Sequence, residues 1–467
     1  MDQRMRNLIR EIAPKIGERV RLMGWVSVRR DHGKIIFIDL RDRTGIVQLI
    51  FTPKDSGLYE VANTLRPEWV IAIEGVVQKR PKGMENPEIV TGGIEIPVEK
   101  LEVLNPAETP PFDIAGDGAE IDEELRLKYR YLDLRRPRLQ KNLRLRAEFI
   151  KHARDFLESR DFIEIETPML TKSTPEGSRD FVVPSRLHPG KFYALPQSPQ
   201  QYKQFLMIAG FERYFQIARA LRDEDLRADR GFEHTQVDLE MSFVERVDVM
   251  KLVEELLIYA AEKIGKKIKE KQFPVFTYKE AMEKFGADKF DLRNDQEKKD
   301  GVLAFAWVVD FPVFEKTEEG GWTYGHNPFT GMKKEDEEGF LSGTADLAGL
   351  TSLQYDLVCN GHEVAGGGVR INRAEVLKKV FEVIGHTDDK IRSEFGHMLE
   401  AFSYGAPPHG GIALGVERFL MILAGESYLR EVQAFPMTSG GKIAVMDAPS
   451  ELTAKQLKEL NLKGLGL

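Results

Sequence analysis

Short apolar runs separated by turns fill the chain from Arg19 to about Leu104, and this pattern constrains the fold more than any other feature of the sequence. Apolar and polar residues alternate around Gly24, and further apolar runs lie at 35–38, 46–50, 70–77 and 94–103. A helical stretch at about 55–65 separates the third run from the fourth and ends before Pro67. Five strands with a helix in that place predict an OB barrel, a fold that often binds single-stranded nucleic acid. Another small β-barrel is the alternative.

A Pro-rich break at 105–111 and a Gly-rich, acidic stretch at 113–122 end this first unit. We expect an OB-fold domain at 1–105, a hinge at 106–140, a larger domain at 141–450 and a tail at 451–467. Apolar residues at helical spacing over 143–157, followed by an alternating strand at 163–166, give the larger domain a mixed α/β (α+β) character.

Composition excludes several classes of protein. With 30% charged and 42% hydrophobic residues, the 467-residue chain can form large cores and is not disordered in bulk. Its longest apolar run, 302–309, is shorter than the ~18 residues of a spanning helix, and no secretory signal is visible, so we expect no membrane partner. The single cysteine, Cys359, excludes a disulfide framework and favours a cytoplasmic protein. The net charge of −8 gives no global basic field for nucleic acid.

Two predicted strands, 214–219 and 235–240, flank a charged segment at 223–232 and form a hairpin with a long loop. Arg222 and Glu224 stand where the first strand ends. In a nucleotide site, a guanidinium group clamps a phosphate through two hydrogen bonds, and a carboxylate accepts from an amine. A solvated charged hairpin is the competing interpretation.

A second segment, 410–418, predicts an apolar strand that enters a helix with Arg418 in its first turn. A cation there is disfavoured by the helix dipole and by burial, so Arg418 needs an anionic partner, either a phosphate or a structural carboxylate. The Gly-rich run at 363–370 lacks the spacing of a P-loop or a Rossmann fingerprint. Asp356 and Glu363, on the same β segment, could bind a divalent ion such as Mg²⁺ that is bridged to phosphates.

Together these segments resemble a known family. Residues 162–168 (FIEIETP), 221–224 (LRDE) and 415–418 (GVER) resemble motifs 1, 2 and 3 of the class II aminoacyl-tRNA synthetases. More narrowly, 171–181, 195–200 and 222–230 are similar to bacterial-type aspartyl-tRNA synthetases. The resemblance implies an N-terminal OB-fold β-barrel and a class II catalytic domain built on an antiparallel β-sheet flanked by helices. It also implies a homodimer with Pro168 near the two-fold axis.

The resemblance further implies an enzyme that joins L-aspartate to ATP and transfers the aspartyl group to tRNA. A carboxylate with a pKa near ~3.9 is already ionised, so this first step needs alignment and charge stabilisation instead of a base. The implied catalytic residues are Arg222, Glu224 and Arg418, and the implied ligands of Mg²⁺ are Asp356 and Glu363. The implied ATP-binding residues are Arg222, Asp223, Glu224, Gly231, His234, Gln236, Glu363, Gly415, Val416, Glu417 and Arg418. Those for aspartate are Glu176, Gln200, Lys203, Arg222, Asp238, His326 and Arg370, and those for the tRNA anticodon are Arg30, His32, Phe37, Gln48, Gly83 and Glu95.

Three departures from the family pattern carry predictions of their own. His234 stands where the bacterial members usually have the Phe that stacks on adenine, which predicts weaker or pH-sensitive ATP binding. The short segment 293–302 stands where the bacterial members of the family carry a large inserted domain. His32 and Gly83 resemble the non-discriminating form, which charges both tRNA-Asp and tRNA-Asn.

Three alternatives stay open: a synthetase strictly specific for tRNA-Asp, an asparaginyl-tRNA synthetase and a non-catalytic tRNA-binding paralogue. The cations Arg370 and Lys203 favour aspartate over an amide. The interpretation as an enzyme requires Arg222 and Arg418 to face one nucleotide-sized cavity.

Overall fold

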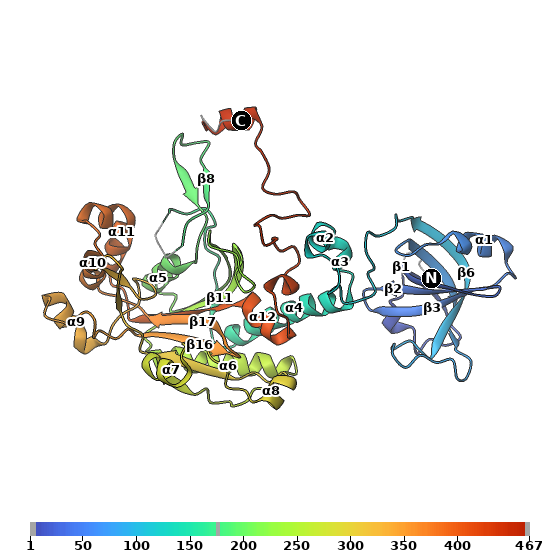
Figure 1. Ribbon diagram of the computed structural model, residues 1–467, viewed down its shortest axis with the longest axis horizontal. Helices are drawn as coiled ribbons and strands as arrows, with labels where there is room; N and C mark the ends of the chain where they lie inside the picture. Colours follow the sequence, from blue (N-terminus) through green and yellow to red (C-terminus); the bar gives the residue numbers. More distant parts are fainter. Residues whose placement is uncertain (1–5, 174–177, 463–467) are drawn as a thin grey trace. The chain divides into compact units, whose positions relative to one another are not determined.

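The computed structural model describes residues 6–173 and 178–462, and the chain forms two compact units that divide after Ile121 (Figure 1). The expected hinge, 106–140, is therefore shared between the units. From Asp122 onward it belongs to the second unit and forms helices α2 (Glu123–Lys128) and α3 (Arg130–Asp133), followed by the start of α4 (Pro137–Glu158).

The first unit is a closed barrel, as the alternating pattern predicts. Its six-stranded sheet has the order β3-β2-β1-β4-β6-β5, and a parallel pairing of β3 with β6 closes it. The strands are β1 (Arg19–His32), β2 (Ile35–Asp42), β3 (Gly45–Phe51), β4 (Val70–Val76), β5 (Gln78–Lys79) and β6 (Ile94–Asn105), with η1 (Ile9–Glu11) before them and α1 (Ser56–Thr64) after β3. In β2, Ile36, Ile38 and Leu40 are buried, so Phe37 lies on the opposite face and is not part of the core.

The second unit is built on an eight-stranded sheet with the order β12-β13-β16-β17-β18-β11-β10-β7. Neighbouring strands are antiparallel except for one parallel pair at each end, β12–β13 and β10–β7. The strands are β7 (Ile163–Glu164), β10 (Arg213–Leu221), β11 (Glu233–Ser242), β12 (Val275–Thr277), β13 (Phe305–Val309), β16 (Gln354–Cys359), β17 (His362–Val369) and β18 (His409–Gly415). The predicted hairpin at 214–240 is therefore β10–β11, and β18 pairs with both β11 and β17.

Helices α4, α6 (Arg246–Lys263) and α12 (Val416–Ala424) cover one face of this sheet and bury the main core against it (Figure 1). The core includes Phe149 of α4, Leu257 of α6, Phe419 of α12 and Leu239 of β11. A second core forms around α9 (Lys334–Ser342), α10 (Ala374–Val383) and α11 (Asp388–Phe402). With one face of the sheet covered in this way, the middle strands can present polar residues on the other face.

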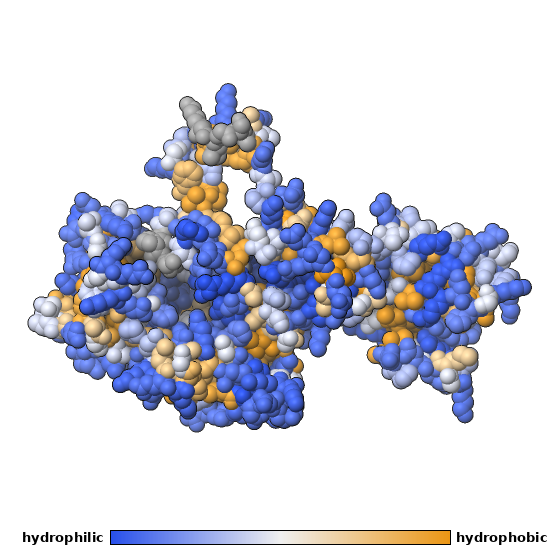
Figure 2. Space-filling model, in the orientation of Figure 1, coloured by the Kyte–Doolittle hydropathy of each residue, from blue (hydrophilic) through white to orange (hydrophobic). Residues whose placement is uncertain are grey.

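Smaller elements complete the unit: β8 (Val182–Pro184), β9 (Phe192–Ala194), α5 (Gln200–Ile208), α7 (Tyr278–Phe285), α8 (Asp295–Lys299), β14 (Phe314–Lys316), β15 (Trp322–Tyr324), η2 (Leu429–Val432) and α13 (Ala454–Glu459). Helix α8, capped by Asn294, lies in the short segment 293–302, and α13 lies in the expected tail. Polar residues dominate the visible surface, while apolar side chains gather on the β8–β9 hairpin, where Val182 and Leu187 are exposed (Figure 2). Within the described ranges, no helix combines the length and the apolar character needed to cross a membrane.

Candidate active site

A cavity of about 370 Å³ opens on the polar face of the sheet and collects most of the residues predicted for ATP and aspartate. Its walls come from strands β11, β16, β17 and β18, from helices α5 and α12, from the loop between β10 and β11, and from the loop after β15. Of the predicted residues, those that line it are Gln200, Lys203, Arg222, Glu224, Gly231, His234, Gln236, Asp238, His326, Asp356, Glu363, Arg370, Gly415, Glu417 and Arg418.

Two predicted residues within the described part of the chain do not line this cavity. The Asp223 carboxylate lies 3.4 Å from the guanidinium of Arg179 and is drawn to that side of the loop. Val416 is fully buried in the main core beneath the first turn of α12. Glu176, predicted for aspartate, falls outside the described residues.

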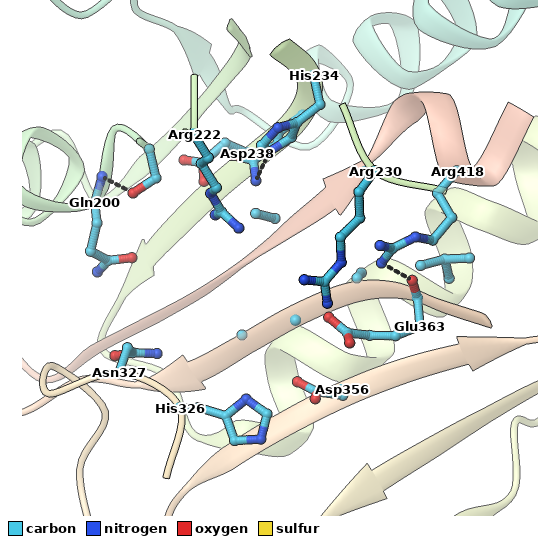
Figure 3. A pocket seen from close by; sticks show the side chains of 18 of the residues that line it. Gln200, Arg222, Arg230, His234, Asp238, His326, Asn327, Asp356, Glu363 and Arg418 are labelled. Atoms are coloured by element: carbon cyan, nitrogen blue, oxygen red, sulfur yellow. Dashed lines mark hydrogen bonds between the residues drawn. The ribbon is translucent and has the colours of Figure 1, made fainter. Parts of the chain in front are cut away.

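Arg222 and Arg418 point into the same space, from the end of β10 and from the first turn of α12 (Figure 3). Arg222 Nε donates to the carbonyl of Gln197 at 3.3 Å. Arg418 Nη1 donates to the carbonyl of Glu363 at 2.8 Å, and its Nη2 lies 3.4 Å from the Asp229 carboxylate. Its Nε is buried without a partner among the described residues. Carbonyl oxygens and one carboxylate at 3.4 Å hold these guanidinium groups loosely, so the two arginines keep hydrogen-bonding capacity for an anion.

Glu224 lies in the same loop and is already engaged. Its carboxylate accepts from the Ser178 hydroxyl, and Arg230 Nη1 lies 3.4 Å away. Arg230 also points into the cavity (Figure 3). The loop between β10 and β11 therefore brings a third guanidinium group to this end of the site.

Asp356 and Glu363 face each other across Gly366. A Cβ atom at Gly366 would lie 3.1 Å from Asp356 Oδ1 and 3.7 Å from Glu363 Oε1, so glycine leaves room for both carboxylates. Burial and the Glu363 charge raise the pKa of Asp356 well above its ordinary value. Burial disfavours the charge of Glu363 too, but Lys289 and Arg418 outweigh it and lower the pKa of Glu363.

This carboxylate pair fits Mg²⁺ that arrives with a nucleotide. Among the described residues, no group of three His, Cys, Asp or Glu side chains could hold a metal ion. Mg²⁺ is typically bound through one or two carboxylates together with substrate phosphates and waters. Asp356 and Glu363, with the arginines opposite, are the residues that could hold such an ion (Figure 3).

The other end of the cavity is a closed network of buried charges. Lys203 Nζ lies 2.9 Å from Asp238 Oδ2 and 3.1 Å from Glu240 Oε2. Arg370 binds Glu240 through two hydrogen bonds, of 2.9 and 3.2 Å. Burial disfavours the charge of Glu240, but Arg370 and Lys203 overcome this and lower the pKa of Glu240 to about 2. Burial raises the pKa of Asp238 despite Lys203 beside it.

Sequence reasoning missed Glu240, although a signal for it exists. Gln236, Asp238 and Glu240 alternate along β11, so their side chains share one face of the sheet. On the neighbouring strand β18, a Cβ atom at Gly411 would lie only 2.0 Å from Glu240 Oε2, so the glycine makes space for this carboxylate. The polar side chains that line the cavity but were not predicted are those of Ser198, Asp229, Arg230, Asn327 and Gln354.

His234 sits in the cavity wall among cations. Burial lowers its pKa to about 3, and Arg222, Arg418 and Arg219 contribute further. The imidazole is therefore neutral around physiological pH. A ring that stays neutral in this range does not favour pH-sensitive ATP binding through His234, and weaker ATP binding stays a prediction.

The residues predicted for the anticodon lie mainly on one face of the barrel. Arg30 binds the Asp39 carboxylate at 2.8 Å and lies 3.4 Å from Gln48 Oε1, and Gln48 in turn donates to Glu95 at 3.1 Å. The edge of His32 meets Phe37, with ring centroids 5.8 Å apart. Gly83 lies in the loop between β5 and β6, where no atom of the described residues lies within 4 Å of the position that its Cβ would take.

Comparison with known proteins gives one consistent result. Residues 122–439 match the family model "tRNA synthetases class II (D, K and N)", and residues 20–104 match the "OB-fold nucleic acid binding domain". The curated Aspartate--tRNA(Asp/Asn) ligases of Rubrobacter xylanophilus and Syntrophomonas wolfei are each 42% identical over 96% of this chain, and the matches cover 95% and 97% of those proteins. The first alignment spans 574 positions, so this relative carries more than a hundred residues without a counterpart in the 467-residue chain.

Solved structures share the fold of both units. The asparaginyl-tRNA synthetase of Pyrococcus horikoshii, complexed with asparaginyl-adenylate, has a TM-score of 0.73 at 24% identity over 93% of this chain and 98% of its own. The aspartyl-tRNA synthetase of Entamoeba histolytica has a TM-score of 0.73 at 23% identity, over 92% and 91%. From its barrel, its cavity and its full-length similarity, the chain belongs to the class II aminoacyl-tRNA synthetases, in the family of the aspartate–tRNA(Asp/Asn) ligases.

Proposed function

We propose that this chain couples L-aspartate to ATP and then transfers the aspartyl group to the 3′ end of both tRNA-Asp and tRNA-Asn. One observation carries the proposal: Arg222 and Arg418 face a single cavity that also contains Asp356, Glu363 and the buried cation Arg370. Cations for a triphosphate at one end and for an acidic side chain at the other suit the two substrates of the first step. ATP, tRNA and ribosomes meet in the cytoplasm, which is the location we propose.

The first step needs no general base. The α-carboxylate of aspartate is ionised at neutral pH, since its pKa is near ~3.5. One of its oxygens bonds to the α-phosphorus of ATP while the bond to pyrophosphate breaks, and pyrophosphate leaves with the electron pair. Arg222 would hold the α-phosphate and Arg418 the far end of the triphosphate, so both align the reactants and offset charge in the transition state.

Asp356 and Glu363 would hold Mg²⁺ together with the phosphates of ATP. When bound, the ion would neutralise negative charge on the departing pyrophosphate. His234 lies next to Gln236 on β11, and its neutral ring would stack on the adenine.

The buried network would select the amino acid. The bonds of Arg370 to Glu240 and to the Gly411 carbonyl use Nε and Nη2, so Nη1 can meet the side-chain carboxylate of aspartate. Asp238 Oδ1 is buried without a partner in the described ranges and can accept from the substrate ammonium. An amide in place of the carboxylate would turn a donor toward Arg370, which rejects asparagine.

The barrel would bind the anticodon. Phe37 is half-buried outside the barrel core and would stack on a base, with Arg30, Gln48 and Glu95 around it. His32 and the open space beside Gly83 would relax the reading of the third anticodon position, where tRNA-Asp and tRNA-Asn differ. The names of the 42% identical relatives support this dual specificity.

The deciding experiment has two stages. Amino-acid-dependent pyrophosphate exchange should respond to aspartate and not to asparagine, and purified tRNA-Asp and tRNA-Asn should then both be aspartylated. As an internal comparison, Phe37→Ala should leave exchange unchanged and lower tRNA charging about tenfold, since one stacked base contributes ~1–3 kcal/mol. Exchange with asparagine instead of aspartate would refute the proposed activity. Rejection of tRNA-Asn by more than about 10³-fold, or ~4 kcal/mol, would refute the dual specificity alone.

A second copy of the chain would cover the exposed end of the catalytic sheet. Strand β7 ends the described sheet, and its residue Ile163 is 49% exposed. We propose a homodimer through this end, with Pro168 beside it. Sedimentation should give twice the 53.2 kDa mass of the chain, and a stable monomer would contradict the dimer.

A further inference from the structure

A lysine from outside the three motifs reaches the carboxylate pair. Lys289 lies in the loop after α7, and its Nζ is 2.9 Å from Glu363 Oε2. Neither the sequence patterns nor the family motifs used above include this residue. It is a cation in direct contact with one of the two carboxylates that would hold Mg²⁺.

The chain after Lys289 is fixed by the core, so the lysine is presented in a defined place. Phe290 is 7% exposed and stacks on Phe285 with ring centroids 4.0 Å apart. Its carbonyl accepts from Gly361 N at 3.0 Å, which ties the loop to the turn between β16 and β17. That turn leads directly into Glu363, so Lys289 and its partner are anchored to the same part of the sheet.

Glu363 is held from two sides, through its backbone carbonyl and through one oxygen of its carboxylate. Arg418 Nη1 binds the Glu363 carbonyl at 2.8 Å, while Lys289 binds Oε2 of its carboxylate. The other oxygen, Oε1, approaches the space beside Gly366 that Asp356 Oδ1 also approaches. With Oε2 engaged by Lys289, the Glu363 carboxylate keeps Oε1 turned toward Asp356.

We propose that Lys289 is a positioning residue that fixes Glu363 so that Glu363 Oε1 and Asp356 can share the Mg²⁺ of Mg·ATP. The inference rests on the proposed function, because it takes the nucleotide and its metal from there. Groups that hydrogen-bond to a metal-ligating side chain orient it, and their loss typically weakens metal binding by about 10–100-fold. Lys289 is expected to act in this way, without contacting the reacting atoms.

The test compares three variants in the full-length protein. Lys289→Met removes the ammonium, Lys289→Arg keeps a cation, and Lys279→Met removes a lysine on α7 whose side chain is 84% exposed. Binding of Mn²⁺, followed by electron paramagnetic resonance in the presence of a non-hydrolysable ATP analogue, reports on the site without turnover. Lys289→Met should raise the Mn²⁺ concentration for half-saturation about tenfold, whereas Lys289→Arg and Lys279→Met should stay within about twofold of the unaltered protein.

Pyrophosphate exchange gives the second readout. Lys289→Met should need about tenfold more Mg²⁺ for half-maximal exchange, while kcat at saturating Mg²⁺ should remain within about threefold. Unchanged Mn²⁺ binding in Lys289→Met would overturn the proposal. Tighter binding would also overturn it, because Lys289 would then compete with the metal, and so would an equal loss in Lys289→Arg. Absence of aspartate-dependent exchange in the unaltered protein would instead refute the proposed function, and the Mn²⁺ measurement would still test Lys289.

Discussion

The two ends of the active-site cavity handle charge in opposite ways. At the aspartate end, the side chains of Lys203, Arg370, Asp238 and Glu240 are at most 3% exposed, and their ion pairs are 2.9–3.1 Å long. At the phosphate end, the Arg418 side chain is 24% exposed, and its contact with Asp229 is 3.4 Å long. Arg222 contacts a carbonyl oxygen at 3.3 Å.

This difference separates selection from catalysis. A closed network of buried charges holds one shape, and any change that leaves one member unpaired is strongly unfavourable. Loosely held guanidinium groups keep their hydrogen-bonding capacity for a ligand whose charge shifts during the reaction. We therefore expect substitutions of the buried charges at the aspartate end to reduce both stability and activity, and substitutions of Arg222 or Arg418 at the phosphate end to reduce activity alone.

The largest effect is expected from Arg370→Met. Glu240 would remain buried without its two hydrogen bonds, which costs about 3–5 kcal/mol of the free energy of unfolding. Aspartate would lose its partner as well, so kcat/KM for aspartate should fall about 10³-fold. Urea unfolding and aspartate-dependent exchange measure the two effects.

A matched control is Arg373→Met, three positions further on. Arg373 pairs with Glu337, Glu338 and Glu375 at the surface, where its side chain is 38% exposed. Its loss should change the unfolding free energy by less than about 1 kcal/mol. If Arg370→Met lowered kcat/KM for aspartate by less than tenfold, the buried network would not be what selects the amino acid.

A smaller effect, confined to activity, is expected from Arg222→Lys. An ammonium group cannot grip a phosphate through two parallel hydrogen bonds, so kcat for exchange should fall about 10²-fold. The unfolding free energy should stay within about 1 kcal/mol, because the hydrogen bond from Arg222 to the Gln197 carbonyl is long, at 3.3 Å. Arg186→Lys, at an exposed position, is the control. A loss of stability as large as that of Arg370→Met would remove the distinction between the two ends.

The two ends of the cavity also differ in how far the sequence alone could predict them. Alternation at 19–104 predicts the barrel because each strand has one face in the core, and the motifs place Arg222 and Arg418 at strand ends that meet. The pairing of Arg370 with Glu240 depends on which strands are neighbours in the sheet, and β17, β18 and β11 are far apart in the chain. Lys289 reaches Glu363 from a loop whose sequence has no pattern of its own, so only the folded chain reveals the contact.

The smallest effect is expected from His234→Phe, which tests whether the phosphate end is free of titration. With a pKa of about 3, His234 stays neutral, so KM for ATP should be flat from about pH 6 to about pH 8 and should change less than about threefold in the variant.

The stability of the protein should respond to His234→Phe instead. Between its ordinary pKa of 6.5 and about 3, His234 carries a proton in the unfolded state only, so the native protein loses stability as pH falls through this window. His234→Phe should remove that loss, whereas His188→Phe, at an exposed site, should not. A KM for ATP that rises in acid for the unaltered protein but not for His234→Phe would show that the ring does titrate in the site, and that charge at the phosphate end depends on pH.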